Sequence, residues 1–185
     1  ILKKKTYFIN GSVTLSSVDA TLPAYIEKVF NKIDGVFVRE RKSFDNIGKY
    51  INFSKIQVIP DSVFSLNTEK LNSKKRDGFC FSLSMLPMQR FPIDKDNPII
   101  KILNKVSLKY GKCTFLAKDV EDQYLKKLAL YLNAEFLGKN YTYKEVEDCL
   151  RRSKLLISGR YHHLIFALRQ GCPIIGFKSS SHKID

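Results

Sequence analysis

The sequence has 185 residues, of which 44% are hydrophobic and 27% are charged, a composition typical of a soluble globular protein with one sizeable core or two small ones. No apolar run reaches the roughly 18 residues that a membrane-spanning helix needs, so we expect a cytoplasmic protein, or one peripheral to the inner face of the plasma membrane. The formal net charge of +14 indicates an anionic partner, and nucleic acid, anionic lipid and phosphorylated or acidic sugars all fit that requirement.

The distribution of the positive charge narrows this set of partners. The lysines are scattered along the chain and form no basic arm, and no nucleic-acid-binding motif is present, so we do not expect nucleic acid. Peripheral contact with an anionic membrane stays open, as does a basic surface that serves solubility alone.

The four cysteines argue against a zinc site. They are far apart in the sequence and form no Cys-x-x-Cys pair: Cys80, Cys113, Cys149 and Cys172. No metal is therefore expected. Three of the cysteines sit in apolar segments, which predicts buried thiols and a reducing compartment.

Strand and helix signals alternate through the first 65 residues. We expect three strands, at residues 5–10, 36–39 and 56–59, and two helices, at residues 21–34 and 43–51. Three strands are few for a complete domain, so we expect residues 1–65 to form a Rossmann-like domain that is incomplete in this chain. The polar segment 66–77 predicts a linker.

The alternation continues over residues 78–185, which we expect to form a second, doubly wound Rossmann-like domain with a parallel sheet. Acidic residues open its second helix, where they suit the helix dipole. The expected strands are 78–84, 113–117, 134–137, 155–158 and 173–177, and the expected helices are 97–110, 119–132, 142–152 and 161–170.

The segment from 155 to 183 carries the strongest chemical signal. A buried strand ends at Ser158, and Gly159 then lets a ligand approach the backbone closely. A helix begins near Arg160, and its N-terminus and guanidinium both suit a carboxylate or phosphate. Ligands of open α/β sheets bind at the carboxyl ends of strands, which is where these residues lie.

Two histidines follow directly on this helix. His162 can donate or accept a proton, whereas His163, one position further on, is expected to pack or to form hydrogen bonds. The apolar face of the helix is predicted to be Leu164, Ile165 and Leu168. The next strand ends in a loop whose Ser180, His182 and Lys183 add a second rim suited to anions and sugars.

Three segments together resemble the polysaccharide pyruvyltransferase family. The segment SGRYHHLIFALRQGCPIIGFKSSSHK resembles the family's C-terminal signature, in which Arg-x-His opens a helix before Ala-Leu, Gly-x-Pro, an apolar strand and Lys. The segments GVFVRERKS and VIPDSVFSL resemble the family's Arg-Glu strand and Pro-Asp element, in the expected order. The resemblance runs from about residue 5 to residue 183.

This resemblance implies a GT-B-like fold and transfer of a pyruvyl group from phosphoenolpyruvate to two hydroxyls of a glycan or lipid-linked saccharide, in cell-surface polysaccharide synthesis. It implies that Arg160 and Arg39 bind the donor's carboxylate and phosphate. It assigns general acid or base catalysis to His162 and places Lys183 near the phosphate. No cofactor is implied, because phosphoenolpyruvate is itself a substrate.

Alternatives stay open. The glycine-rich Asn-x-Gly-Asp turn that opens the family's sequences has no match here, and Asn10-Gly11-Ser12 does not replace it. The chain is alternatively a nucleotide-sugar glycosyltransferase of the same architecture, or a non-catalytic relative that binds an anionic glycan. In structural rather than catalytic roles, Arg160 would bond carbonyls at a strand end, and Arg39 would form an interdomain salt bridge with Asp61.

Overall fold

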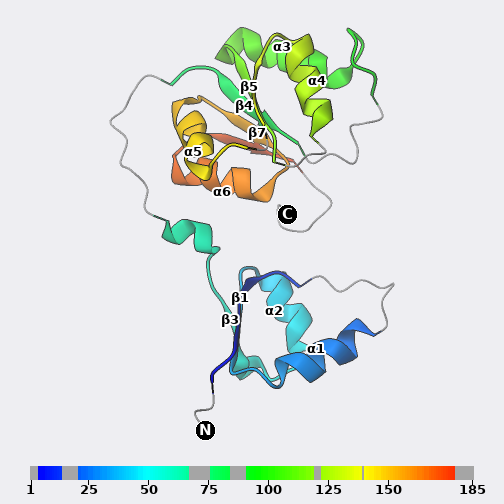
Figure 1. Cartoon of the computed structure of the whole chain (residues 1–185), viewed down its shortest axis with the longest axis vertical. Helices are drawn as coiled ribbons and strands as arrows, with labels where there is room; N and C mark the ends of the chain where they lie inside the picture. The colour runs from blue at the N-terminus through cyan, green and yellow to red at the C-terminus, as the bar shows by residue number, and fades with distance from the viewer. Residues whose placement is uncertain are drawn as a thin grey trace. The chain divides into compact units, whose positions relative to one another are not determined.

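The computed structural model describes residues 4–13, 21–66, 76–83, 91–118, 122–138 and 140–177. The chain divides into two compact units, Ile1–Leu66 and Asn67–Asp185, and each is considered by itself (Figure 1). Most of the expected linker, residues 67–75, lies outside the described residues.

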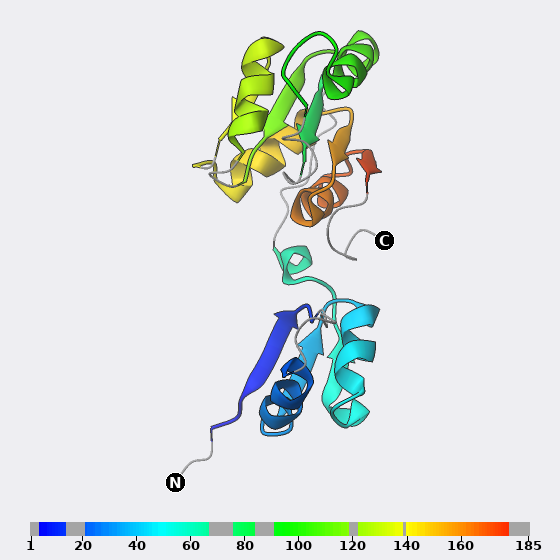
Figure 2. The same ribbon diagram turned by 90° about the vertical axis from the view of Figure 1, so that its right-hand side faces the viewer.

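The N-terminal unit is a three-stranded parallel sheet with helices packed on it (Figure 2). Its core joins Val36 and Val38 of the sheet to Ile26 and Ile47 of the helices. On the opposite face of the sheet, the side chain of Ile9 is exposed. The elements in chain order are β1 (Tyr7–Gly11), α1 (Leu22–Phe30), β2 (Gly35–Val38), α2 (Arg41–Gly48), the 3-10 helix η1 (Phe53–Lys55), β3 (Ile56–Val58) and the 3-10 helix η2 (Ser62–Ser65).

The C-terminal unit is a five-stranded parallel sheet in the order β6-β5-β4-β7-β8. This is the order of a doubly wound, Rossmann-like half, as expected from the alternating pattern. Its elements are β4 (Phe79–Ser82), α3 (Pro98–Tyr110), β5 (Cys113–Leu116), α4 (Gln123–Tyr131), β6 (Glu135–Leu137), α5 (Tyr143–Arg152), β7 (Leu156–Ser158), α6 (Tyr161–Arg169) and β8 (Ile174–Gly176).

Two cores cover the two faces of this sheet (Figure 1). On one face, Phe79 and Phe115 pack against α3 and α4. On the other, Cys80 and Leu156 pack against α5 and α6. Strands buried on both faces read as continuous apolar runs, which is why the sequence pattern located them.

The helix α6 differs from expectation in which side it buries. Leu164 and Ile165 are buried as expected, but Leu168 is 54% exposed. The buried side of α6 instead includes His163 and Ala167, so the imidazole of His163 points into the protein.

Among the helices in the described ranges, none has both the length and the hydrophobicity that crossing a bilayer requires.

Candidate functional site

The candidate site lies where the strand order of the C-terminal sheet reverses. β4 is followed in sequence by β5 on one side, whereas β7 lies on its other side, so the loops after β4 and β7 diverge at this edge. The last residues of the two strands, Ser82 and Ser158, are paired in register and are both fully buried. The backbone N–H of Gly159 donates to the carbonyl of Ser82 over 3.2 Å, which holds the two strand ends together.

Arg160 is the N-cap residue of α6 and connects three loops at this edge. Its backbone N–H donates to the hydroxyl of Ser158 over 2.9 Å. Its Nε donates to the carbonyl of Leu83, after β4, over 2.9 Å. Its Nη2 lies 2.5 Å from Oδ1 of Asp122, which follows β5. The side chains of Arg160 and Asp122 are 12% and 1% exposed, so this is a buried, charge-assisted pair.

Asp122 has a different role from the one its sequence position suggests. It precedes α4, where an acidic residue was expected to complement the helix dipole, but its side chain forms no cap hydrogen bond with α4. Its Oδ2 instead accepts the backbone N–H of Lys118 over 2.6 Å, while Oδ1 receives Arg160. Asp119 and Glu121, the other acidic residues of that segment, lie outside the described residues.

His163 is held at both ring nitrogens. Its Nδ1 lies 2.6 Å from the hydroxyl of Ser82, and its Nε2 lies 3.1 Å from the hydroxyl of Tyr141. The residue is 3% exposed, so the expectation that it packs and forms hydrogen bonds is confirmed. The hydroxyl of Ser82, at the end of β4, and that of Tyr141, in the loop before α5, fix the orientation of the ring.

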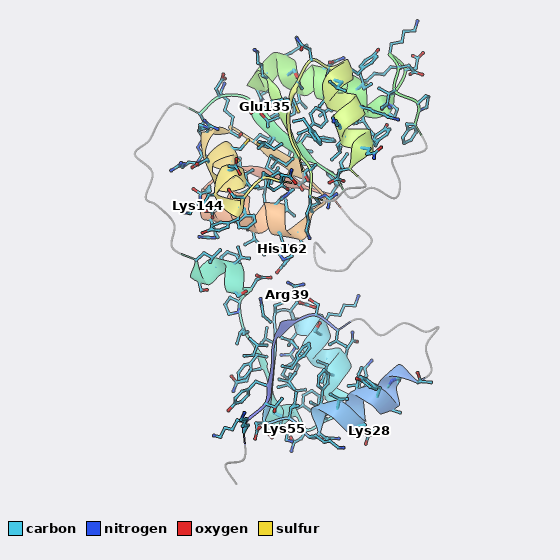
Figure 3. All side chains as sticks on the ribbon, viewed as in Figure 1. Lys28, Arg39, Lys55, Glu135, Lys144 and His162 are labelled. Atoms are coloured by element: carbon cyan, nitrogen blue, oxygen red, sulfur yellow. The ribbon has the colours of Figure 1, made fainter. Side chains whose placement is uncertain are left out.

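His162 occupies a more open position on the same turn of α6 (Figure 3). It is half-buried, and its ring lies edge-on to that of Tyr161, with centroids 5.5 Å apart. Two adjacent histidines therefore have different surroundings, because successive residues on a helix point about 100° apart.

Gly159 is buried against Phe177, a contact that the sequence did not indicate. A Cβ at this position would lie 2.7 Å from the ring of Phe177 and 3.5 Å from its carbonyl oxygen. The close approach expected between the backbone and a ligand is thus made, on one side, by Phe177. The remaining members of the predicted rim, Ser180, His182 and Lys183, lie outside the described residues.

The N-terminal unit gathers polar residues at the carboxyl ends of its own strands. Arg39 follows β2, and its Nη1 donates to Oδ2 of Asp61 over 2.8 Å, while its Nε donates to the hydroxyl of Ser12 over 2.7 Å. That hydroxyl lies 2.9 Å from Oε2 of Glu40. The Arg39–Asp61 salt bridge is formed, but within one unit, so the expectation of an interdomain bridge was wrong.

Asp61, which follows Pro60, caps the 3-10 helix η2 in addition to pairing with Arg39. Its side chain is 1% exposed, and its Oδ1 accepts the backbone N–H of Val63 at the start of η2. Arg39 is itself 11% exposed, so this second arginine–aspartate pair is also buried.

All four cysteines are buried and reduced, as expected for three of them. Burial raises the pKa of the Cys172 thiol to about 11 and shifts that of Cys113 further upward. A hydrogen bond with Cys149, followed by burial, raises the pKa of Cys80. Within the described ranges, His, Cys, Asp and Glu side chains do not gather in groups of three that could hold a metal ion.

Sequence reasoning did not identify Ser82, the observed role of Asp122, or the contact of Tyr141 with His163. Ser82 gave the same signal as Ser158, a hydroxyl at the end of a buried strand, and could have been found that way. Tyr141 and Asp122 reach the site only through the order of strands in the sheet.

Solved structures similar to this chain establish its fold. A mutant of S. aureus TarM, in complex with Fondaparinux, alpha-GlcNAc-glycerol and UDP, matches with a TM-score of 0.60 and 19% identity, over 96% of this chain and 37% of that one. A second TarM structure matches with a TM-score of 0.60 and 18% identity, over the same shares. The chain thus spans a little over a third of the length of these proteins, and its two parallel-sheet units have a GT-B-like fold.

No curated protein matches the sequence significantly. The sequence model of the family described as polysaccharide pyruvyl transferase matches residues 1–181, nearly the whole chain. The protein therefore belongs to the polysaccharide pyruvyl transferase family.

Proposed function

We propose that this protein transfers a pyruvyl group from phosphoenolpyruvate to two hydroxyls of a glycan, forming a cyclic ketal. The observation that carries the proposal is the position of the family's Arg-x-His motif. Arg160 and His162 open α6 at the carboxyl edge of the C-terminal sheet, beside the point where its strand order reverses. Ligands of open α/β sheets bind at this point.

Arg160 is the proposed donor ligand. The donor is small and strongly anionic, and a guanidinium next to the N-terminus of a nine-residue helix offers it positive charge and backbone N–H groups. The bonds from Arg160 to Leu83 and Asp122 hold the guanidinium in one orientation before a ligand arrives. Preorganisation of this kind reduces the entropy that binding costs. Arg39 and Lys183 stay predicted donor ligands.

His162 is the proposed proton donor and acceptor. Protonation of the methylene carbon of phosphoenolpyruvate generates a cation at the neighbouring carbon, which one sugar hydroxyl attacks. Phosphate leaves, and a second hydroxyl closes the ketal, so one donor and two hydroxyls yield one ketal and one phosphate. An imidazole with a pKa near neutrality suits both the acid and the base steps. His162 is preferred over His163 because it is half-buried and more accessible to a substrate, whereas His163 is buried between Ser82 and Tyr141.

The family name also supports a glycan as acceptor, and we extend this to a saccharide carried on a lipid or growing polymer at the cytoplasmic face of the membrane. A nucleotide-sugar glycosyltransferase is the second candidate. Only the fold similarity to TarM, whose crystal structure contains UDP, favours it.

Phosphate release from phosphoenolpyruvate in the presence of a glycan acceptor tests the proposal, with the ketal identified by mass spectrometry. We expect release that depends on the acceptor, and a loss of about 10²–10⁴-fold in turnover for His162→Gln, the range for one general acid or base. Leu168→Gln, at an exposed position on the same helix, serves as the control. If sugar transfer from a nucleotide sugar occurs and phosphoenolpyruvate is not consumed, the proposal is wrong.

A further inference from the structure

A cavity of about 510 Å³ opens at the carboxyl ends of β5 and β6, between the first turns of α4 and α5. Its lining includes Gln123 and Lys126 from α4, Phe136 from β6, and Asn140, Tyr141 and Glu145 from the start of α5 and the loop before it. Its volume lies within the roughly 300–1,000 Å³ typical of small-molecule sites.

Two side chains of its wall also belong to the candidate site. Asp122 lines the cavity and binds Arg160, and Tyr141 lines it and binds His163. A molecule in this cavity would therefore lie directly beside the residues at the end of β4 and β7. A larger hollow of about 660 Å³ lies at the opposite, amino-terminal edge of the sheet, near Lys112 and Glu135, and shares no residue with the site. Position thus favours the cavity beside β5 and β6.

Among the described residues that line the cavity, the charges nearly cancel, although the chain as a whole carries +14. Among the lining residues, Lys126 contributes one positive charge and Glu145 one negative charge, while Asp122 is balanced by Arg160. Hydrogen bonds from the backbone N–H and then the hydroxyl of Thr142 lower the pKa of Glu145, so this carboxylate stays ionised. The described lining carries no net positive charge, so the cavity does not suit a strongly anionic donor such as phosphoenolpyruvate.

The remaining lining groups are those that recognise an uncharged ring bearing hydroxyls. The side-chain amides of Gln123 and Asn140 both donate and accept hydrogen bonds, and the phenol of Tyr141 does the same. Phe136 and Leu137 supply an apolar wall. A pyranoside presents a C–H face to such a wall and its hydroxyls to the amides, carboxylate and phenol.

We propose that this cavity binds an uncharged pyranoside, which is the sugar unit of the acceptor glycan. The identification as acceptor rests on the proposed function, whereas the binding of a sugar rests on the cavity alone. Tyr141 would then connect the sugar to His163, and Asp122 would connect it to Arg160.

Saturation-transfer-difference NMR on the whole chain tests this inference without any donor. The probes are methyl β-galactopyranoside, methyl α-mannopyranoside and methyl N-acetyl-β-glucosaminide. We expect saturable transfer to at least one of them, and at least a tenfold weaker affinity for the double variant Gln123→Ala, Asn140→Ala. The control is Lys127→Ala, Lys144→Ala, which alters exposed residues of the same two helices that are not among the lining residues and should leave affinity within twofold.

Absence of transfer to all three pyranosides, or undiminished binding by the Gln123 and Asn140 variant, would overturn the inference. Competition by UDP at equal or higher affinity would also overturn it, because the cavity would then suit a nucleotide. Calorimetry with phosphoenolpyruvate on the same samples separates this inference from the proposed function. If the Gln123 and Asn140 variant loses pyranoside binding but keeps phosphoenolpyruvate binding, the result supports the cavity as the sugar site. If the wild type binds a pyranoside but not phosphoenolpyruvate, the result refutes only the proposed donor.

Discussion

The two units contain the same kind of arginine–aspartate pair in different surroundings. Each places an arginine within two residues of the end of a strand and pairs it with a buried aspartate: Arg39 with Asp61 at 2.8 Å, and Arg160 with Asp122 at 2.5 Å. In the N-terminal unit a second carboxylate, that of Glu40, lies 3.6 Å from the same arginine. In the C-terminal unit, the neighbouring features are His163, whose two ring nitrogens are both hydrogen-bonded, and a cavity lined by Asp122.

This difference indicates what each arginine is suited to. Arg39 has the carboxylates of Asp61 and Glu40 within 4 Å, and Arg160 forms its buried pair with Asp122 at the N-terminus of α6. We expect an anionic donor to gain more from Arg160, because this arginine is the N-cap residue of a nine-residue helix whose N-terminus also favours negative charge. Arg39 at the same time connects the ends of β1, β2 and β3, a role that stabilises the smaller sheet.

The largest expected effect comes from breaking either buried pair. Asp122→Ala and Asp61→Ala each remove the carboxylate that offsets a buried guanidinium, and each should lower the free energy of unfolding by about 3–5 kcal/mol. Urea unfolding measures this. The control is Lys101→Ala, which breaks an exposed pair with Asp96 and should cost no more than about 1 kcal/mol. Costs for both aspartates as small as that of the control would show that the pairs are not buried in solution.

The adjacent histidines should separate stability from activity. His163→Ala removes the hydrogen-bond partner of Ser82 and Tyr141 and leaves a void, so we expect a loss of about 2–3 kcal/mol in the free energy of unfolding. His162→Ala, at a half-buried position, should cost no more than about 1 kcal/mol yet reduce turnover. The reverse pattern, an inactive but stable His163 variant, would move the proton-transfer role to His163.

A smaller effect is expected at the start of α5. Thr142 and Glu145 form a capping box, and Thr142→Ala should lower the free energy of unfolding by about 1 kcal/mol. The pKa of Glu145 lies below its ordinary value of 4.5, so its contribution is present above that pH and is lost as the pH falls further. The variant should therefore lose stability less steeply than the wild type on acidification. Parallel acid titrations of both proteins would contradict this role.

A further effect distinguishes the two units at alkaline pH. All four cysteines belong to the C-terminal unit, and the pKa values of Cys80, Cys113 and Cys172 are raised. For these three thiols the unfolded forms ionise first, so their stabilising contribution is complete below pH 9 and declines as the pH rises towards about 11. The hydrogen bond with Cys80 lowers the pKa of Cys149, whose contribution therefore has the opposite sign. Hydrogen exchange should show this decline in the C-terminal unit alone. Equal declines in both units would point to another cause.

The sequence predicted the elements of the fold well and the contacts of the site only in part. Strands buried on both faces and amphipathic helices leave local patterns, so their order and the position of Arg160 could be predicted. Asp122 is 38 residues from Arg160, and Tyr141 is 22 residues from His163. Such pairings depend on which strands become neighbours in the sheet, which no local pattern records. The exposure of Leu168 has the same origin, because the inward turn of His163 sets the rotation of α6.

The central claim is that the C-terminal unit binds phosphoenolpyruvate through Arg160. The most direct test is calorimetric titration of phosphoenolpyruvate into the wild type, Arg160→Lys and Arg39→Lys, with thermal unfolding confirming that each variant is folded. We expect saturable binding by the wild type, at least tenfold weaker binding by Arg160→Lys because lysine lacks the planar fork, and a smaller loss for Arg39→Lys. Unchanged affinity in Arg160→Lys, or no binding by the folded wild type, would contradict the account.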